Sequence, residues 1–219
     1  MTKSTPRIAL IHALRDSVAP ALDAMARGWP EAKATNLLDD SLSADLARDG
    51  RLTPAMTDRF VTLARYAVAA GADGILFTCS AFGPAIEAAR AAVAVPVLKP
   101  NESAFAAALA AGPRIGMLVT FTGSLAALQA ELHAMAGGSR LDVHARLVPG
   151  ALASLQTGDG SGHDAAIAAD AAELPACDAI VLGQFSMARA QSAVAARVAC
   201  PVLTTPDAAI ADLRRRLAA

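Results

Sequence analysis

Short apolar runs alternate with longer segments rich in alanine and leucine along the whole chain. The short runs are bounded by Gly, Pro and Asp and predict strands, and the longer segments between them predict helices. This alternation is typical of an α/β fold, in which helices flank a mainly parallel sheet. We expect eight strands, at residues 7–12, 34–38, 74–78, 95–98, 114–120, 142–147, 179–183 and 201–204.

Two helix starts are marked by a threonine followed by a proline. Thr53 and Thr205 both have this pattern. A threonine hydroxyl can accept a hydrogen bond from the first helical turn, and proline fits the first helical position because it has no backbone donor to lose. The second of these helices is expected at residues 206–219. Its Arg214 to Arg216 suit a helix C-terminus, where the dipole favours cations, so they predict a solvated face.

Short motifs recur between the two halves of the chain at a nearly constant spacing. The triplet Pro6-Arg7-Ile8 returns 107 positions later at Pro113, and Pro96-Val97-Leu98 returns 105 positions later at Pro201. Such internal similarity indicates duplication of one structural unit. We therefore predict two α/β lobes related by a pseudo-twofold axis. Lobe one would be residues 1–112, lobe two residues 113–205, with the helix at 206–219 able to pack back on lobe one.

Composition and charge narrow the class of protein. A net charge of −1 gives no broad basic surface for nucleic acid or acidic lipid. The mean hydropathy of +0.41 reflects 56 alanines, and no unbroken apolar run reaches the roughly 18 residues of a spanning helix. Three scattered cysteines indicate neither a disulfide scaffold nor a metal site. The first residues, MTKSTP, lack the regions of a signal peptide. We expect a cytoplasmic protein that binds neither nucleic acid nor membrane.

The predicted topology distinguishes the three cysteines. Ligands of open parallel sheets bind beyond the carboxyl ends of the strands, so two such lobes are expected to enclose one site between facing strand ends. Cys79 follows a predicted strand and precedes a helix, whose dipole and free N–H groups lower a thiol pKa. Cys177 and Cys200 precede their strands and are predicted to pack in the core. Cys79 is therefore the candidate nucleophile or base, with an inert buried cysteine as the alternative.

Polar residues at the ends of the first strand of each lobe are the next candidates. Thr120, Phe121 and Thr122 end that strand in lobe two, where hydroxyl and N–H groups could bind a substrate carboxylate. Capping of the next helix by Thr122 or Ser124 is the alternative. His12 ends the matching strand of lobe one. It is either a proton relay or donor to substrate, or a structural histidine.

Two further segments lie near predicted strand ends. Lys99, Asn101 and Glu102 follow one strand, and Glu102 could orient Cys79 or form a charged pair at a lobe interface. The glycine-rich residues 157–164 lack the lysine of a phosphate-binding loop, so they predict a mobile loop leading into a helix.

Three motifs carry a family resemblance. FTCSA at 77–81, VLGQFSMA at 181–188 and the two PRI strands resemble the aspartate/glutamate/hydantoin racemase superfamily over nearly the whole chain. The resemblance implies two Rossmann-like lobes, no cofactor, no metal, a small carboxylate substrate and a homo-oligomer. It also implies two cysteines that face each other across a cleft, one for each face of the substrate α-carbon.

The chain departs from this pattern at the second cysteine. Cys79 matches the first one, but the spacing of 105 places Gln184 at the second. An amide can hold a carboxylate or carbonyl but exchanges no proton near neutral pH. Maleate isomerases of the superfamily retain both cysteines, and its arylmalonate decarboxylases keep only the one in lobe two. This chain has the reverse arrangement, so the reaction type stays open.

The resemblance and the residues together suggest a cofactor-independent isomerase or racemase. A Cys79 thiolate would act as base or nucleophile at an activated carbon, and N–H groups around Ser80 and Thr120 would stabilise an enediolate. Thr78, Gln184 and Ser186 are expected to contact substrate as well, although Ser186 could instead cap a helix. The alternatives are a decarboxylase, with Cys79 protonating one face, and a non-catalytic ligand-binding protein.

Overall fold

The computed structural model describes residues 5–218, which divide into two compact units. The first unit, lobe one, runs to Pro100 and includes the chain from Ala209 onward, and the second unit, lobe two, is Asn101–Ala208. The expected boundary at residue 112 would place helix α5 (Glu102–Ala111) in lobe one. Instead α5 belongs to lobe two, because Ala104, Phe105 and Ala108 pack in that lobe's core. The expectation about a signal peptide rests largely on residues 1–4, which lie outside the described residues.

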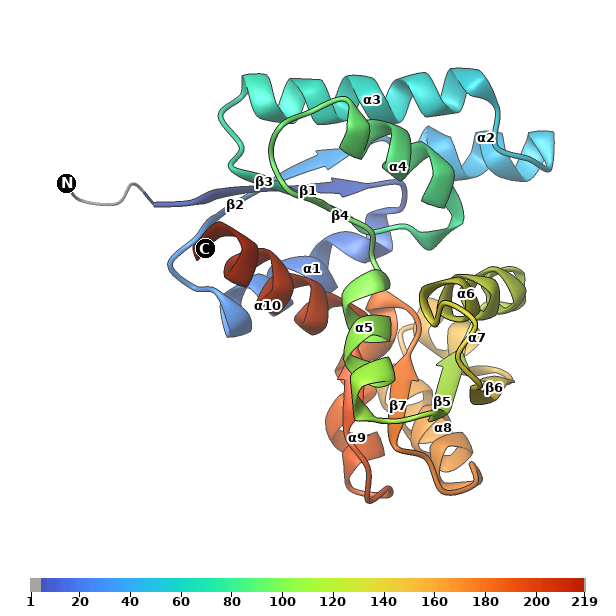
Figure 1. Ribbon diagram of the computed structural model, residues 1–219. Helices are drawn as coiled ribbons and strands as arrows, with labels where there is room; N and C mark the ends of the chain where they lie inside the picture. The colour runs from blue at the N-terminus through green and yellow to red at the C-terminus, as the bar shows by residue number, and fades with distance from the viewer. Residues whose placement is uncertain (1–4, 219) are drawn as a thin grey trace. The chain divides into compact units, whose positions relative to one another are not determined.

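Each lobe holds a four-stranded parallel sheet within the described part of the chain (Figure 1). The strand order is β2-β1-β3-β4 in lobe one and β6-β5-β7-β8 in lobe two, so the topology repeats with the sequence. Every predicted strand is found, with its ends within two residues of the prediction. The strands are β1 (Arg7–His12), β2 (Lys33–Leu38), β3 (Gly74–Phe77), β4 (Val97–Leu98), β5 (Arg114–Val119), β6 (Asp142–Leu147), β7 (Ala179–Leu182) and β8 (Val202–Thr204).

Helices cover both faces of each sheet. In lobe one, α2, α3 and α4 pack on the face that carries Ile11 and Phe77, and α1 and the end of α10 lie on the other face, where Leu213 approaches Gly74. In lobe two, α5 and α6 cover one face and α7, α8 and α9 the other. The remaining helices are α1 (Val18–Gly28), α2 (Ser41–Asp49), α3 (Pro54–Ala69), α4 (Gly83–Ala91), α6 (Thr122–Met135), α7 (Ala151–Gln156), α8 (Gly160–Ala172), α9 (Gln191–Ala195) and α10 (Thr205–Ala218).

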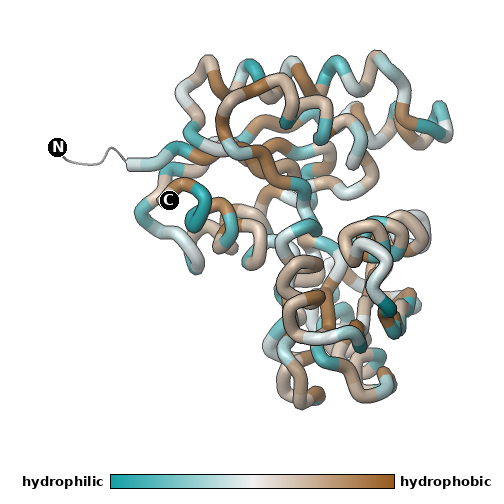
Figure 2. The backbone as a smooth tube through the Cα atoms, in the orientation of Figure 1, coloured by the Kyte–Doolittle hydropathy of each residue, from teal (hydrophilic) through white to brown (hydrophobic). Residues whose placement is uncertain are grey.

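The inner strands β3 and β7 are apolar because helices bury them on two sides: residues 74–77 and 179–182 are buried throughout. The edge strands β2 and β6 are exposed or half-buried and carry polar residues, and in Figure 2 the hydrophobic colour is concentrated in the interior of each lobe. Continuous burial is what a parallel sheet between two helical layers requires. None of the helices within residues 5–218 is long and apolar enough to cross a membrane.

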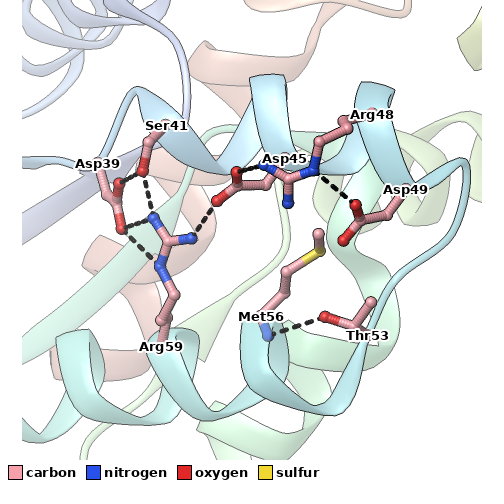
Figure 3. A network of polar contacts seen from close by, with 8 residues as sticks. All are labelled: Asp39, Ser41, Asp45, Arg48, Asp49, Thr53, Met56 and Arg59. Carbon is pink, nitrogen blue, oxygen red and sulfur yellow. Dashed lines mark hydrogen bonds and ion pairs between the residues drawn. The ribbon is translucent and has the colours of Figure 1, made fainter.

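A network of charged side chains ties α2 to α3 beside the carboxyl end of β2 (Figure 3). Arg59 on α3 donates to Asp39 Oδ2 from Nε at 3.0 Å and to Asp45 Oδ2 at 2.6 Å. Arg48 in turn donates to Asp45 at 2.8 Å. Burial raises the pKa of Asp39, but the hydrogen bonds from Arg59 and Ser41 outweigh it and hold the pKa below its usual value. The network fixes the segment that follows β2.

One of the two expected helix caps is present and one is displaced. Thr53 Oγ1 accepts from Met56 N at 3.3 Å, as predicted. At α10, however, Thr204 Oγ1 accepts from Asp207 N at 3.3 Å, and Thr205 is already the first helical residue. A cap needs a non-helical backbone, which Thr204 has as the last residue of β8. The prediction for Thr205 is therefore wrong by one residue. The predicted end of this helix at 219 lies outside the described residues.

The two adjacent threonines give a matched test of this assignment. Thr204→Val should lower the free energy of unfolding by about 1 kcal/mol, because it removes the cap. Thr205→Val should change it by less than about 0.5 kcal/mol or raise it, since Thr205 Oγ1 is buried without a hydrogen-bond partner in residues 5–218. Urea unfolding of both variants measures the difference. Equal losses would contradict the assignment of the cap.

Candidate active site

Cys79 lies in a turn that buried aromatic rings hold on both sides. It follows β3 and precedes the short 3₁₀ helix η2 (Ser80–Phe82), with extended backbone angles of φ −121° and ψ 117°. The ring of Phe60, on α3, lies 5.1 Å from that of Phe77 and 4.8 Å from that of Phe82. All three rings are buried, so packing fixes the chain immediately before and after Cys79.

Burial raises the pKa of the Cys79 thiol, and a hydrogen bond from the backbone of Ala81 opposes this only in part. The expectation of a lowered pKa is therefore wrong. The thiol packs against the apolar core of lobe one, where a thiolate loses its hydration. The residues directly after the thiol form a 3₁₀ turn of three residues, and α4 begins only at Gly83, so the dipole of α4 acts on the sulfur from beyond its first turn. The thiol form is favoured near neutral pH.

The other two cysteines lie at the amino ends of their strands, as predicted. Cys177 and Cys200 precede β7 and β8 and pack against the core of lobe two. The Cys177 thiol donates to the carbonyl of Pro175 at 3.1 Å, and burial raises the pKa of both thiols. Their prediction as packing residues is confirmed.

His12 joins two other polar side chains inside lobe one. Its Nδ1 lies 2.9 Å from Thr78 Oγ1 and its Nε2 3.0 Å from Asn36 Oδ1. Because the amide oxygen only accepts, Nε2 carries the ring proton, and the Thr78 hydroxyl proton is shared between His12 Nδ1 and the Ile11 carbonyl, 3.4 Å away. Burial lowers the pKa of His12, and the hydrogen bond to Asn36 only partly opposes it, so the ring is neutral. Both ring nitrogens of His12 form hydrogen bonds within lobe one.

Asn36 is the member of this group that sequence analysis missed. It lies opposite Leu10 in the β1–β2 pair, and side chains two residues apart on a strand share a face, so Asn36 and His12 lie on the same side. A polar amide in the otherwise apolar end of a predicted strand was the available signal.

Gln184 follows β7 in lobe two, at the position that the repeat aligns with Cys79. Its side chain binds the end of β5. Its Oε1 accepts from Thr120 N at 2.7 Å and from Thr120 Oγ1 at 2.8 Å, and its Nε2 donates to Ser124 Oγ at 3.2 Å. The donors of Thr120 that were expected to bind a substrate carboxylate are therefore taken by a side chain of the protein itself.

The remaining candidates near β5 and β7 do not cap helices. Phe121 is the N-cap residue of α6 without a side-chain cap, so neither Thr122 nor Ser124 satisfies an N–H there. Ser124 Oγ instead donates to the Phe121 carbonyl at 2.8 Å. The ring of Phe121 is 56% exposed. Ser186 is half-buried within the 3₁₀ helix η3 (Phe185–Ala190) and caps neither η3 nor α9.

The charged and glycine-rich candidates have structural partners. Lys99 pairs with Glu87 of α4 at 3.1 Å. Asn101 is buried, and its Nδ2 has no hydrogen-bond partner in residues 5–218. The loop predicted at 157–164 is confined to residues 157–159, because α8 already begins at Gly160; Asp159 caps that helix by accepting from Gly162 N at 2.8 Å. A carboxylate at this helix start disfavours phosphate there. No group of three or more metal-binding side chains occurs in residues 5–218.

Comparison with known families decides which class of protein has this architecture. The model of the Asp/Glu/hydantoin racemase family matches residues 16–215. The chain belongs to this family. A comparison with curated protein sequences gave no significant match.

Solved structures share the two-lobe fold of this racemase-family protein. Allantoin racemase from Klebsiella pneumoniae superposes with a TM-score of 0.73 at 18% identity, over 98% of this chain and 88% of that one. A glutamate racemase isoform from Bacillus anthracis gives 0.69 at 14% identity, over 99% and 82%. A glycine-to-cysteine mutant of arylmalonate decarboxylase, in a sulfate-associated form, gives 0.71 at 20% identity, over 97% and 94%. At these identities the likeness establishes the fold.

The neutral, buried His12 predicts a pH dependence of stability. Its folded pKa lies below the unfolded value of 6.5, so the unfolded chain binds more protons as pH falls. The free energy of unfolding should therefore decrease as pH drops below 6.5 toward the lowered folded value. His12→Asn should be less stable at pH 7 by about 1–3 kcal/mol, because it breaks this buried chain of hydrogen bonds, and should lack that decrease.

Urea unfolding between about pH 7 and 5, above the range of ordinary carboxylates, measures this effect. His133→Asn, on the exposed side of α6, is the control and should follow the unmodified protein. Parallel curves for the unmodified protein and His12→Asn would show that another group causes the pH dependence.

Proposed function

We propose that this racemase-family protein is a cofactor-independent isomerase or racemase that acts on a small carboxylate through Cys79. The observation that carries the proposal is the position of Cys79 at the carboxyl end of β3, as the N-cap of η2. Cys177 and Cys200 lie at the opposite ends of their strands. Membership of the Asp/Glu/hydantoin racemase family supports chemistry at a carbon next to a carboxylate.

In this proposal Cys79 moves a proton at the substrate carbon. As a thiolate it removes the proton from the activated carbon, and the electron pair of that bond delocalises into the carboxylate or carbonyl. The Ala81 N–H that faces the sulfur stabilises the thiolate when it forms. Thr78, hydrogen-bonded to His12, and Ser80 adjoin Cys79 in the chain and would contact the substrate.

A one-faced decarboxylation is the second candidate, and two observations favour it. Gln184 stands where the repeat spacing of 105 places the second cysteine expected from the family resemblance, and an amide delivers no proton near neutral pH. The raised pKa of Cys79 keeps the thiol protonated, as a general acid requires. In this reaction the bond to CO₂ breaks, its electrons stay on the α-carbon, and the thiol donates its proton there. The thiolate then regains a proton from water.

The pH profile distinguishes the two roles of Cys79. If the thiolate is the base, kcat/KM should rise with pH through the neutral and mildly alkaline range, because the thiol pKa is raised. If the thiol is the acid, kcat/KM should fall over the same range. We expect the rising profile, measured as α-proton exchange in deuterated solvent by NMR across a panel of small carboxylates.

The controls for this experiment are two alanine variants. Cys79→Ala should abolish exchange, and Cys200→Ala should leave it unchanged. Release of CO₂ from malonates, with a falling profile and label on one face, would replace the isomerase by the decarboxylase. Ligand binding with neither exchange nor CO₂ release would leave a binding protein.

Gln184→Cys tests the effect of the replaced second thiol. It restores the family pattern, so α-proton exchange should appear or increase, with loss of stereochemistry in the product. Gln184→Ser is the matched control, because it also removes the amide but supplies no thiol. Exchange and product chirality are followed by NMR and chiral chromatography. A Gln184→Cys variant that binds the carboxylate but behaves like Gln184→Ser would count against two-faced chemistry on this scaffold.

A further inference from the structure

The side chain of Gln184 is held as a ligand would be held. Its amide oxygen receives two hydrogen bonds, at 2.7 and 2.8 Å, from the N–H and hydroxyl of Thr120. Thr120 is only 6% exposed, so these donors have little access to water. The amide nitrogen is also engaged, at 3.2 Å from Ser124 Oγ. The whole carboxamide is therefore bound by residues at the end of β5 and the start of α6.

This set of donors suits an anion better than an amide. Two donors that converge on one oxygen form the arrangement used for carboxylate and enolate oxygens, and such bonds strengthen when the oxygen is charged. The Ser124 hydroxyl, which donates to the Phe121 carbonyl at 2.8 Å, can rotate and donate instead to a second oxygen of a ligand. A carboxylate could thus replace the carboxamide, keep both bonds from Thr120 and take over the Ser124 proton from the Phe121 carbonyl.

The backbone explains why Gln184 reaches this position. Gly183 hydrogen-bonds Leu118 through its N–H at 2.9 Å, and a Cβ there would lie 3.1 Å from the Leu118 carbonyl oxygen. This close approach of β7 to β5 brings residue 184 within one side-chain length of Thr120. In lobe one the repeat places Cys79 and Ala13 at these positions, and neither supplies the same donor and acceptor.

We propose that Gln184 is a specificity-determining residue that acts as an internal ligand. Its carboxamide fills an oxyanion site made by Thr120 and Ser124, and so excludes the carboxylate of a ligand from this end of lobe two. The proposal rests on the proposed function for its meaning in catalysis. Its consequence for substrate class is that this end of lobe two does not select a dicarboxylate.

Removal of the carboxamide should open the site to a small carboxylate. Gln184→Ala leaves a space equal to acetamide, which has the shape of acetate. Sodium acetate is titrated into the full-length, ¹⁵N-labelled protein, and the Thr120 amide resonance is followed, with sodium chloride at equal ionic strength as reference. We expect saturable binding to Gln184→Ala that is about tenfold or more tighter than to the unmodified protein. Acetamide should bind more weakly than acetate, because it lacks the charge.

Gln191→Ala is the matched control. It removes another glutamine of lobe two, whose Nε2 donates to the Val202 carbonyl at 3.0 Å, and leaves an acceptor in place of convergent donors. It should bind no acetate. Acetate binding by Gln191→Ala or by the unmodified protein that is as tight as binding by Gln184→Ala would overturn the proposal.

Gln184→Glu keeps the test decisive if the alanine variant does not fold. The introduced carboxylate takes over the bonds to Thr120, so its pKa, measured by NMR titration, should lie below that of an unperturbed glutamate. A raised pKa would contradict an oxyanion site. None of these measurements uses turnover. Acetate binding as expected, with no reaction on any carboxylate, would therefore remove the proposed function and leave this inference intact.

Discussion

The parallel pairing of the two central strands in each lobe determines where the candidate site residues lie. The ladder continues one residue beyond the strands, with Thr78 N donating to Ile11 O at 3.0 Å and Gly183 N donating to Leu118 O at 2.9 Å. Residues that follow β1 and β3, or β5 and β7, are therefore held side by side. The His12–Thr78 and Gln184–Thr120 hydrogen bonds both cross this junction. Each lobe thus joins its first and third strands by side chains as well as by backbone.

The same junction has opposite character in the two lobes. In lobe one an aromatic cluster of Phe60, Phe77 and Phe82 packs around the turn, and the side chain beside it is a desolvated thiol. In lobe two the corresponding residue is an amide with three hydrogen bonds. The two lobes share one strand order but differ in the side chains that follow their third strands. Of the two residues that the repeat aligns here, only Cys79 has a side chain that can exchange a proton, and the proposed function therefore turns on the pH behaviour of that cysteine.

Periodicity and repeats predicted the strands, the duplicated topology and the ends of the sheet at which each cysteine lies, because these follow from local burial patterns. Three features required coordinates. The boundary at residue 101 depends on which core receives Phe105, a choice that a helix apolar from Ala104 to Ala111 does not reveal. The pKa of Cys79 depends on packing around the sulfur, which outweighs the short helix that the sequence does show. The contact of Gln184 with Thr120 joins residues 64 positions apart, and sequence indicated only that both lie at strand ends.

The tight space at Gly183 limits how this scaffold can be altered. A side chain there would meet Leu118 O and Val119 Cγ1, each at 3.1 Å, and Leu128 Cδ1 at 3.2 Å. The equivalent residue in lobe one, Thr78, carries a hydroxyl, so natural variation can place polar groups at two consecutive positions there. In lobe two only residue 184 of this pair can carry a polar side chain. A directed-evolution library for new stereochemistry would therefore concentrate its diversity at that single codon, and would treat the preceding glycine as fixed.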